Sequence, residues 1–184
     1  MSRADVGAPL LALARGAIAH ALGVSDEPGT DASNLAQVGA TFVTLRHDGE
    51  LRGCIGTVTA WRPLAADVRA NALAAAFRDP RFAPLDRAEL ALISIEVSLL
   101  NAGEPLPALA EEVLAAALRP GIDGVVLECA GRRATFLPQV WEQLPAPHDF
   151  LRALKRKAGL AEDFWNGDVR VSRYTVDKFV EGAP

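Results

Sequence analysis

The segment LRGCIGT, residues 51–57, carries the residue of this chain that is best suited to nucleophilic chemistry. Its cysteine, Cys54, lies close to Gly53 and Gly56, and glycines inside a strand let a substrate or another backbone approach closely. Arg52 is two residues away, and a nearby guanidinium favours the thiolate, which is the nucleophilic form of cysteine. Cys54 is therefore a candidate catalytic nucleophile, with Arg52 as its electrostatic partner.

A structural interpretation of the same segment stays open. Cysteine is among the residue types most often buried, and the two glycines also fit a β-bulge or close packing. The segment supplies no base for the thiol, and a local motif of this kind seldom defines an active site by itself.

Two further groups of charged residues are candidates for substrate binding. Arg78, Asp79 and Arg81 crowd together in FRDPRF, where the aspartate can cap or turn the chain and the arginines can pair with it. Glu96 and Glu128 lie on expected strands, where a carboxylate faces water or, if enclosed, acts as a general base. We take Arg81, Glu96 and Asp79 as the candidate substrate-binding residues.

The chain shows no pattern for a metal or a nucleotide cofactor. Its histidines lie in three different expected elements: His20, His47 and His148. Neither Cys54 nor Cys129 belongs to a C-x-x-C pattern, and GxGxxG, GxxxxGK[ST] and GxSxG motifs are absent. We expect no metal and no cofactor, and we interpret Cys129 as a small core residue with a free thiol.

The segment around Cys54 belongs to an expected β-hairpin. Asp48-Gly49 stands between two runs of strand-forming residues, and such a pair supplies the positive φ angles of a tight type I′ turn. Counting outward from that turn gives three cross-strand pairs: His47–Glu50, Leu45–Arg52 and Val43–Cys54. In this register Arg52 and Cys54 share one face of the sheet.

Periodicity and turn signals predict the remaining elements. The expected helices cover residues 1–24, 63–78, 110–118 and 148–158, and Pro138 opens a further short helix. Single strands are expected over 90–100 and 169–179, and a second hairpin over 124–137. These elements indicate an α+β fold with an antiparallel-rich sheet and flanking helices.

Charge and hydropathy limit the classes of function. The net charge of −4 over 184 residues argues against broad binding to nucleic-acid phosphates, which needs clustered lysines and arginines. One basic cluster falls late in the helix 148–158, and we interpret it as a solvated helix end: Arg152, Lys155, Arg156 and Lys157. The N-terminal apolar run is broken by Arg15 and His20, which favours an amphipathic helix over an export signal. No apolar run reaches the roughly 18 to 20 residues of a membrane span, so we expect a cytoplasmic location.

Eight short segments, spread in order over almost the whole chain, form a specific combination. They are FVTL at Phe42, LRGCIGT at Leu51, PLAADV at Pro63, AAFRDPRF at Ala75, ISIEVSLL at Ile93, RPGIDGVVLE at Arg119, FLPQVWEQLP at Phe136 and KAGL at Lys157. Together they resemble the AMMECR-type domain family, known in bacteria as AmmeMemoRadiSam system protein A. Two positions depart from the family pattern: Lys155 stands where relatives often carry cysteine, and Ala134 where glycine is common. The first departure weakens any mechanism that needs a second thiol there.

The resemblance implies a single AMMECR-type domain over residues 1–184, with an α+β fold in a larger and a smaller lobe. We expect the junction between the lobes near residues 101–121, where the proline-containing connection NAGEPLPAL follows a strand. The resemblance also implies association with a Memo-like protein and a radical S-adenosylmethionine protein. It implies no reaction, because the family lacks an agreed biochemical activity.

Three functions stay open at this point. The first is an enzyme or small-molecule-handling component of that three-protein module, with Cys54 as nucleophile or covalent carrier. The second is a non-catalytic adaptor that docks a partner protein, in which LRGCIGT serves packing or an interface. The third, a nucleic-acid-linked regulator, is disfavoured by the acidic balance and the lack of aromatic-basic motifs.

Overall fold

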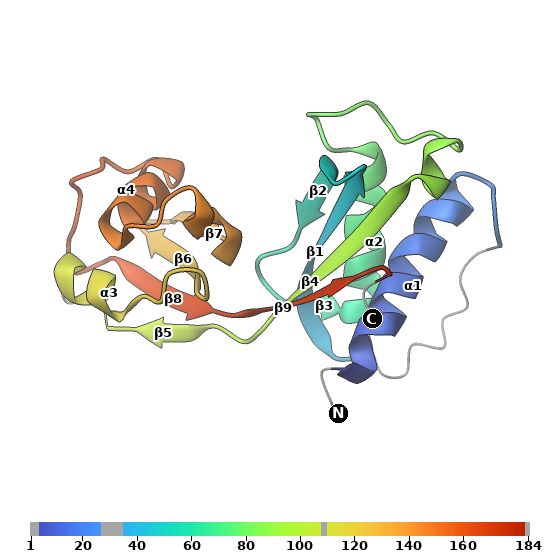
Figure 1. Ribbon diagram of the computed structural model, residues 1–184. Coiled ribbons are helices and arrows are strands. Elements are labelled where there is room, and N and C mark those ends of the chain that lie inside the picture. Colours follow the sequence, from blue (N-terminus) through green and yellow to red (C-terminus); the bar gives the residue numbers. More distant parts are fainter. Residues whose placement is uncertain (1–3, 27–34, 108–109, 183–184) are drawn as a thin grey trace. The chain divides into compact units, whose positions relative to one another are not determined.

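The computed structural model describes residues 4–26, 35–107 and 110–182 (Figure 1). The chain forms two compact units. Unit 1 runs up to Leu100 and resumes at Asp177, whereas unit 2 spans Asn101–Val176. Each unit contains one antiparallel sheet and its own helices, so the α+β fold expected from the sequence is confirmed.

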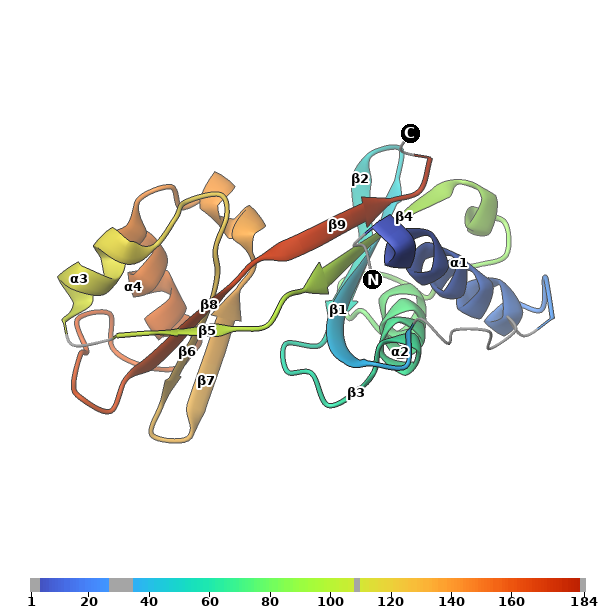
Figure 2. The ribbon, with the colours of Figure 1, turned by 90° about the horizontal axis from the view of Figure 1, so that it is seen from below.

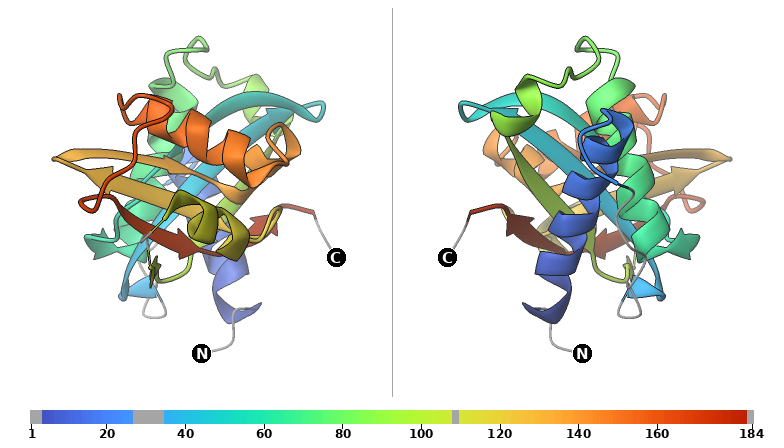
Figure 3. Two further views of the ribbon diagram at one scale, coloured as in Figure 1. Left: turned by 90° about the vertical axis from the view of Figure 1, so that its left-hand side faces the viewer. Right: turned by 90° about the vertical axis from the view of Figure 1, so that its right-hand side faces the viewer.

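Unit 1 is a five-stranded sheet with two long helices on one face. Its helices and strands are α1 (Ala4–Ala21), β1 (Val38–His47), β2 (Glu50–Gly56), β3 (Arg62–Pro63), α2 (Leu64–Phe77), the 3₁₀ helix η2 (Glu89–Ala91), β4 (Ile93–Leu100) and β9 (Val176–Val180). The strand order is β2-β1-β4-β9, and β3 pairs with the start of β1. Figures 2 and 3 show α1 and α2 side by side on the same face of this sheet.

The core of unit 1 lies between that helix pair and the sheet. Leu45 on β1 and Ile95 on β4 point inward and meet Leu10 of α1 and Val68 of α2, all fully buried. Because side chains alternate along a strand, the intervening residues of β1, β2 and β4 lie on the opposite face. We call that face, which carries Thr44, the outer face of unit 1.

Unit 2 repeats the arrangement of a sheet with helices on a smaller scale. Its helices and strands are β5 (Glu104–Leu106), α3 (Glu111–Ala117), β6 (Gly124–Cys129), β7 (Arg132–Phe136), the 3₁₀ helix η3 (Pro138–Glu142), α4 (Pro147–Lys157) and β8 (Arg170–Tyr174), with strand order β5-β8-β6-β7. Trp141 stacks on Phe150 with ring centroids 3.8 Å apart, next to Leu127 of β6 and Leu154 of α4. This core shares no described member with that of unit 1.

The turn of the first hairpin forms as the sequence predicts. Asp48 and Gly49 have φ angles of 50° and 82°, which a tight two-residue turn requires, and His47 pairs with Glu50.

Beyond that turn, a β-bulge changes the register. The observed pairs are Leu45–Gly53, Thr44–Cys54 and Val43–Ile55, so the expected pairs Leu45–Arg52 and Val43–Cys54 are wrong. Arg52 is the extra residue that has no partner across the hairpin. The bulge brings Gly53 to the core side, where a Cβ would lie 2.3 Å from the carbonyl oxygen of Ala75 in α2. Only glycine fits this approach of strand and helix, and Arg52 could not have stood there.

The prediction of a single closing strand over residues 169–179 is also wrong. This segment forms two strands, β8 and β9, which belong to different sheets. Thr175 lies between them, and its carbonyl and hydroxyl oxygens accept the backbone and side-chain N–H groups of Asn101 at 2.9 and 2.8 Å. These two bonds fix Thr175 at the point where the chain passes from one sheet to the other.

The expectation that all four basic residues late in α4 are solvated is wrong for Lys155. Its side chain is 1% exposed and donates to both carboxylate oxygens of Glu111, at 2.9 and 2.8 Å. The position lies one helical turn after Leu151 and next to Leu154, so α4 directs it inward. Arg152 remains on the exposed side of α4, as expected.

Candidate functional site

Strand β2 presents Cys54 on the outer face of unit 1. Gly53 turns toward α2, and its neighbour Cys54 therefore lies on the opposite face, where it is half-buried. Thr44 is its cross-strand partner, and the hydroxyl Oγ1 of Thr44 donates to the Cys54 sulfur at 3.3 Å. The thiol thus has a fixed orientation and a polar neighbour.

The main chain of Cys54 is held from the side by Asp79 and Arg81. Oδ2 of Asp79 accepts the Cys54 N–H at 2.9 Å, and Nη2 of Arg81 donates to the Cys54 carbonyl oxygen at 3.3 Å. The two side chains also bind each other, through Nε–Oδ1 at 2.9 Å and Nη2–Oδ2 at 2.6 Å. Since β2 is the edge strand of the sheet, the pair occupies hydrogen-bonding groups that another strand would otherwise use.

Asp79 is ionised within this arrangement. Hydrogen bonds from the Arg81 guanidinium hold the pKa of this carboxyl far below its usual range, against the opposing effect of burial, and the backbone N–H groups of Cys54 and Arg81 add to the shift. The FRDPRF motif therefore forms the Asp79–arginine ion pair that the structural interpretation expects. This pair hydrogen-bonds to the main chain of Cys54.

Glu96 lies in the same transverse row of the sheet as Cys54. It is the partner of Thr44 across β1 and β4, just as Cys54 is the partner of Thr44 across β1 and β2. The carboxylate accepts Nε of Arg46 and Nζ of Lys178, each at 2.7 Å. Burial acts to raise the pKa of Glu96, but the hydrogen bonds from Lys178 and Arg46 together hold it below its ordinary value.

The side chain of Arg52, the expected partner of the thiol, binds Glu89. Its Nε and Nη2 donate to the two carboxylate oxygens of Glu89 in η2, at 2.7 and 2.9 Å. Hydrogen bonding to Glu89 raises the pKa of this guanidinium. Within the described part of the chain no hydrogen bond joins Arg52 to Cys54, and the guanidinium that touches the cysteine belongs to Arg81.

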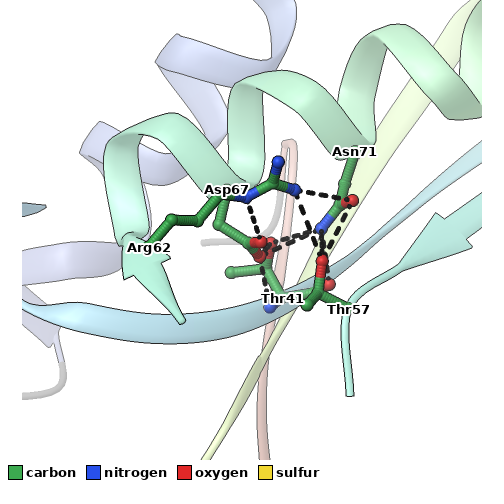
Figure 4. Close-up of polar contacts among 5 residues, drawn as sticks. All are labelled: Thr41, Thr57, Arg62, Asp67 and Asn71. Carbon is green, nitrogen blue, oxygen red and sulfur yellow. Dashed lines mark hydrogen bonds and ion pairs between the residues drawn. The ribbon is translucent and has the colours of Figure 1, made fainter. Parts of the chain in front are cut away.

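Sequence reasoning missed a buried polar cluster under the end of β2 (Figure 4), which we call the Asp67 network: Thr41, Thr57, Arg62, Asp67 and Asn71. Asp67 is fully buried, and its Oδ2 accepts the backbone N–H and the hydroxyl of Thr41 at 2.8 and 2.7 Å. Its Oδ1 accepts Nε of Arg62 at 2.8 Å, while Nδ2 of Asn71 donates to the Thr41 carbonyl at 2.9 Å. The network ties α2 to β1 and to Thr57, the residue that follows β2.

Some of the missed residues had a signal in the sequence. Asp67 and Asn71 are four residues apart among the alanines of α2, so they lie on one face of that helix, and it is the buried face. Thr44, Arg46 and Lys178 had none, because their roles depend on the register of β1 and on β9 lying next to β4.

Two other residues considered from the sequence, Cys129 and Glu128, belong to unit 2. Cys129 is buried in the core of unit 2, next to a hollow of about 610 Å³, and both cysteines are free thiols. Glu128 is exposed and pairs with Arg133 at 3.2 Å. Among the described residues, no group of three or more His, Cys, Asp and Glu side chains could hold a metal ion. No helix in the same part of the chain has the length and apolar character needed to cross a membrane.

Comparison with known proteins identifies the family of this chain. The AMMECR1 family model matches residues 11–179. A protein of Thermofilum pendens is 36% identical over 200 aligned residues, which cover 98% of this chain and 92% of that protein. A protein of Thermotoga maritima is 41% identical over 140 residues, 75% of each chain. The crystal structure of the uncharacterised protein PH0010 from Pyrococcus horikoshii superposes with a TM-score of 0.85 at 32% identity and covers 98% of this chain and 93% of that one.

Proposed function

Because this chain belongs to the AMMECR1 family, whose matched members are uncharacterised, we propose a function from its own site. We propose that it is a small-molecule-handling protein that uses Cys54 as a nucleophile or covalent carrier. The observation that carries the proposal is the Thr44–Cys54 contact on the outer face of unit 1. A hydroxyl that donates to the sulfur holds it in one orientation, which favours attack on an electrophilic atom.

The surroundings of the thiol support the same role. Asp79 and Arg81 hold the main chain of Cys54 at both its N–H and its carbonyl, so the sulfur keeps its place relative to Thr44. Such positioning by buried or paired groups is what a covalent step requires, because small displacements of a reacting atom are costly. Cys54 is half-buried, whereas Cys129 is buried in the core of unit 2.

The test compares folded and unfolded protein in the Cys129→Ala variant, where Cys54 is the single thiol. The second-order rate constant for alkylation by iodoacetamide is measured at one pH, first in the native protein and then in urea. We expect the native thiol to react faster than the unfolded one, although burial alone would slow it. A native rate below the unfolded rate would contradict the proposal.

A second pair of variants assigns the effect to Thr44. Thr44→Val removes the hydroxyl at nearly constant volume, and we expect the native rate to fall toward the unfolded value. Ser98→Ala is the matched control, since it deletes a hydroxyl from the same face whose cross-strand partner is Phe42. Equal rates in all three proteins would remove Thr44 from the account.

The module suggested by the resemblance is a separate proposal: direct binding to a Memo-like protein and a radical S-adenosylmethionine protein. One observation favours a docking role, alone or beside the chemistry. Trp61 and Val38 are 67% and 61% exposed although both are large apolar residues, and β3, which begins directly after Trp61, pairs with β1 at Val38. In a binding assay with the purified partners, Trp61→Ala should weaken the complex while Cys54→Ser should leave it intact. Wild-type affinity of Trp61→Ala would contradict docking through this surface.

A further inference from the structure

The ion pairs on and beside the outer face of unit 1 have buried acids and more exposed cations. Asp79 is 2% exposed, while its partner Arg81 is 53% exposed. Glu96 is 11% exposed, while its partners Arg46 and Lys178 are 36% and 51% exposed. A molecule that approaches this face therefore meets positive groups first, even though the chain as a whole is acidic.

These cations keep hydrogen-bond donors that their acids do not use. Nη1 of Arg81 and Nη2 of Arg46 donate to no acceptor within the described residues, and the Lys178 ammonium has three N–H groups of which Glu96 takes one. Guanidinium and ammonium groups with free donors are the usual binding groups for carboxylate and phosphate.

The cations are connected to Cys54 by one hydrogen bond from Arg81 and by the row of the sheet that Cys54 shares with Glu96. Arg81 contacts the Cys54 carbonyl directly, and Glu96, which binds the other two cations, is two strands away in the same row. Each step between such neighbours is about 5 Å, so the row spans about the size of a small metabolite. A thiol with unused donors beside it and along its row of the sheet is suited to a substrate that carries an electrophilic atom and a negative group.

We propose that the outer face of unit 1 binds an anionic small molecule, carrying a carboxylate or a phosphate, with its electrophilic atom at Cys54. This inference rests on the proposed function, because it names the substrate class of the same site. Arg81 is its principal binding residue, and Lys178 and Arg46 extend the site toward β9.

Two alkylating reagents that differ only in charge provide the test. Iodoacetate and iodoacetamide undergo the same reaction: the sulfur of Cys54 forms a bond to the methylene carbon, the carbon–iodine bond breaks, iodide leaves with the electron pair, and the thiol proton passes to buffer. The measured quantity is the ratio of the iodoacetate rate to the iodoacetamide rate at Cys54 in the Cys129→Ala protein. The same protein unfolded in urea supplies the reference ratio.

We expect the native ratio to exceed the unfolded ratio by about twofold, the preference that one uncompensated charge about 10 Å away produces in water. The excess should disappear between about 0.01 M and 1 M ionic strength, where the screening length falls from about 30 to about 3 Å. Arg81→Gln should lower the native ratio, and Lys178→Gln should do so without touching the main-chain contacts of Cys54. Arg156→Gln removes an exposed, acid-paired arginine of unit 2 and is the control that should change nothing.

The outcomes separate the two claims. A native ratio equal to the unfolded ratio, with iodoacetamide still reacting rapidly, would overturn the anionic substrate and leave the nucleophile in place. A native thiol that reacts with neither reagent, while the unfolded one reacts with both, would overturn the binding site together with the proposed function.

Discussion

Asp79 and Arg81 act on Cys54 through its main chain and leave the sulfur to Thr44. This division has a physical advantage, because an acid close to the sulfur would oppose negative charge there. The Asp79 carboxylate instead accepts hydrogen bonds from the Arg81 guanidinium and from the backbone N–H groups of Cys54 and Arg81. Arg52, two residues before Cys54 in the sequence, attaches η2 to the hairpin through Glu89.

Asp79→Asn should lower the free energy of unfolding by about 1.5–3 kcal/mol at pH 7, the range for hydrogen bonds to a charged group. The folded-state pKa of Asp79 is depressed, so its stabilising effect is fully present above the unfolded pKa of about 3.9 and is lost as the pH falls toward the folded value. Urea unfolding of the wild type and of Asp79→Asn should therefore show a difference in the free energy of unfolding that becomes smaller below about pH 4. A difference that grows on acidification would contradict this role.

The composition of the site could be predicted from the sequence only in part. Cys54, Asp79, Arg81 and Glu96 were identified as candidates from residue type and local pattern, and they do lie on or beside one face. Their connections were not predictable from local pattern, because the contacts between β2 and the Asp79–Arg81 pair, and between β1 and β4, join residues distant in the chain. The partner chosen for the thiol, Arg52, rested on an unbroken hairpin.

At the scale of elements, β2 is fixed from α2 at three points. The middle of the strand touches the helix at Gly53, the residue after the helix leads to Asp79, and the Asp67 network holds Thr57 after the strand ends. The helix thereby sets the position of the strand that carries Cys54.

Gly53→Ala tests the closest of these contacts. The new Cβ would lie 2.3 Å from the Ala75 carbonyl oxygen, so strand or helix must move, and overpacking of this kind costs about 1–3 kcal/mol. Thermal or urea unfolding measures the loss, and the alkylation rate of Cys54 should change with it. Gly167→Ala is the control, because it meets no atom within 4 Å. Equal stability of the two variants would show that the helix does not press on the strand.

Asp67→Ala tests the anchor at the other end. It leaves Nε of Arg62 and the Thr41 N–H without their acceptor, and breaking a buried ion pair on one side costs about 3–5 kcal/mol. Urea unfolding should show this loss, whereas Glu50→Ala, which removes an exposed acid from the same unit, should have a small effect. A loss below about 1 kcal/mol would mean that the network is dispensable.

The elements themselves were more predictable than their register. Helices α2, α3 and α4 and both hairpins follow from periodicity, alanine content and turn residues, which act over a few neighbours. The bulge at Arg52 was not predictable, because it depends on the close approach of Gly53 in β2 to Ala75 in α2. The inward turn of Lys155 likewise depends on Glu111 of another helix.

At the scale of the whole molecule, the two units have separate cores. Phe150→Ala removes the ring that stacks on Trp141 in unit 2, a substitution that costs about 3–5 kcal/mol. Hydrogen exchange followed by mass spectrometry should show lost protection in β6 and α4, while α2 in unit 1 keeps its protection. Equal loss in α2 would show that both units unfold as one cooperative structure.

The central claim is that unit 1 presents one of the two thiols for reaction while unit 2 encloses the other. The most direct measurement is a short pulse of iodoacetamide on the wild-type protein, followed by peptide mapping of Cys54 and Cys129 in the same molecules. The account predicts that Cys54 is modified and that Cys129 is spared until urea is added. Equal modification of both thiols, or an unmodified Cys54 in a protein whose unfolded form labels at both, would contradict it.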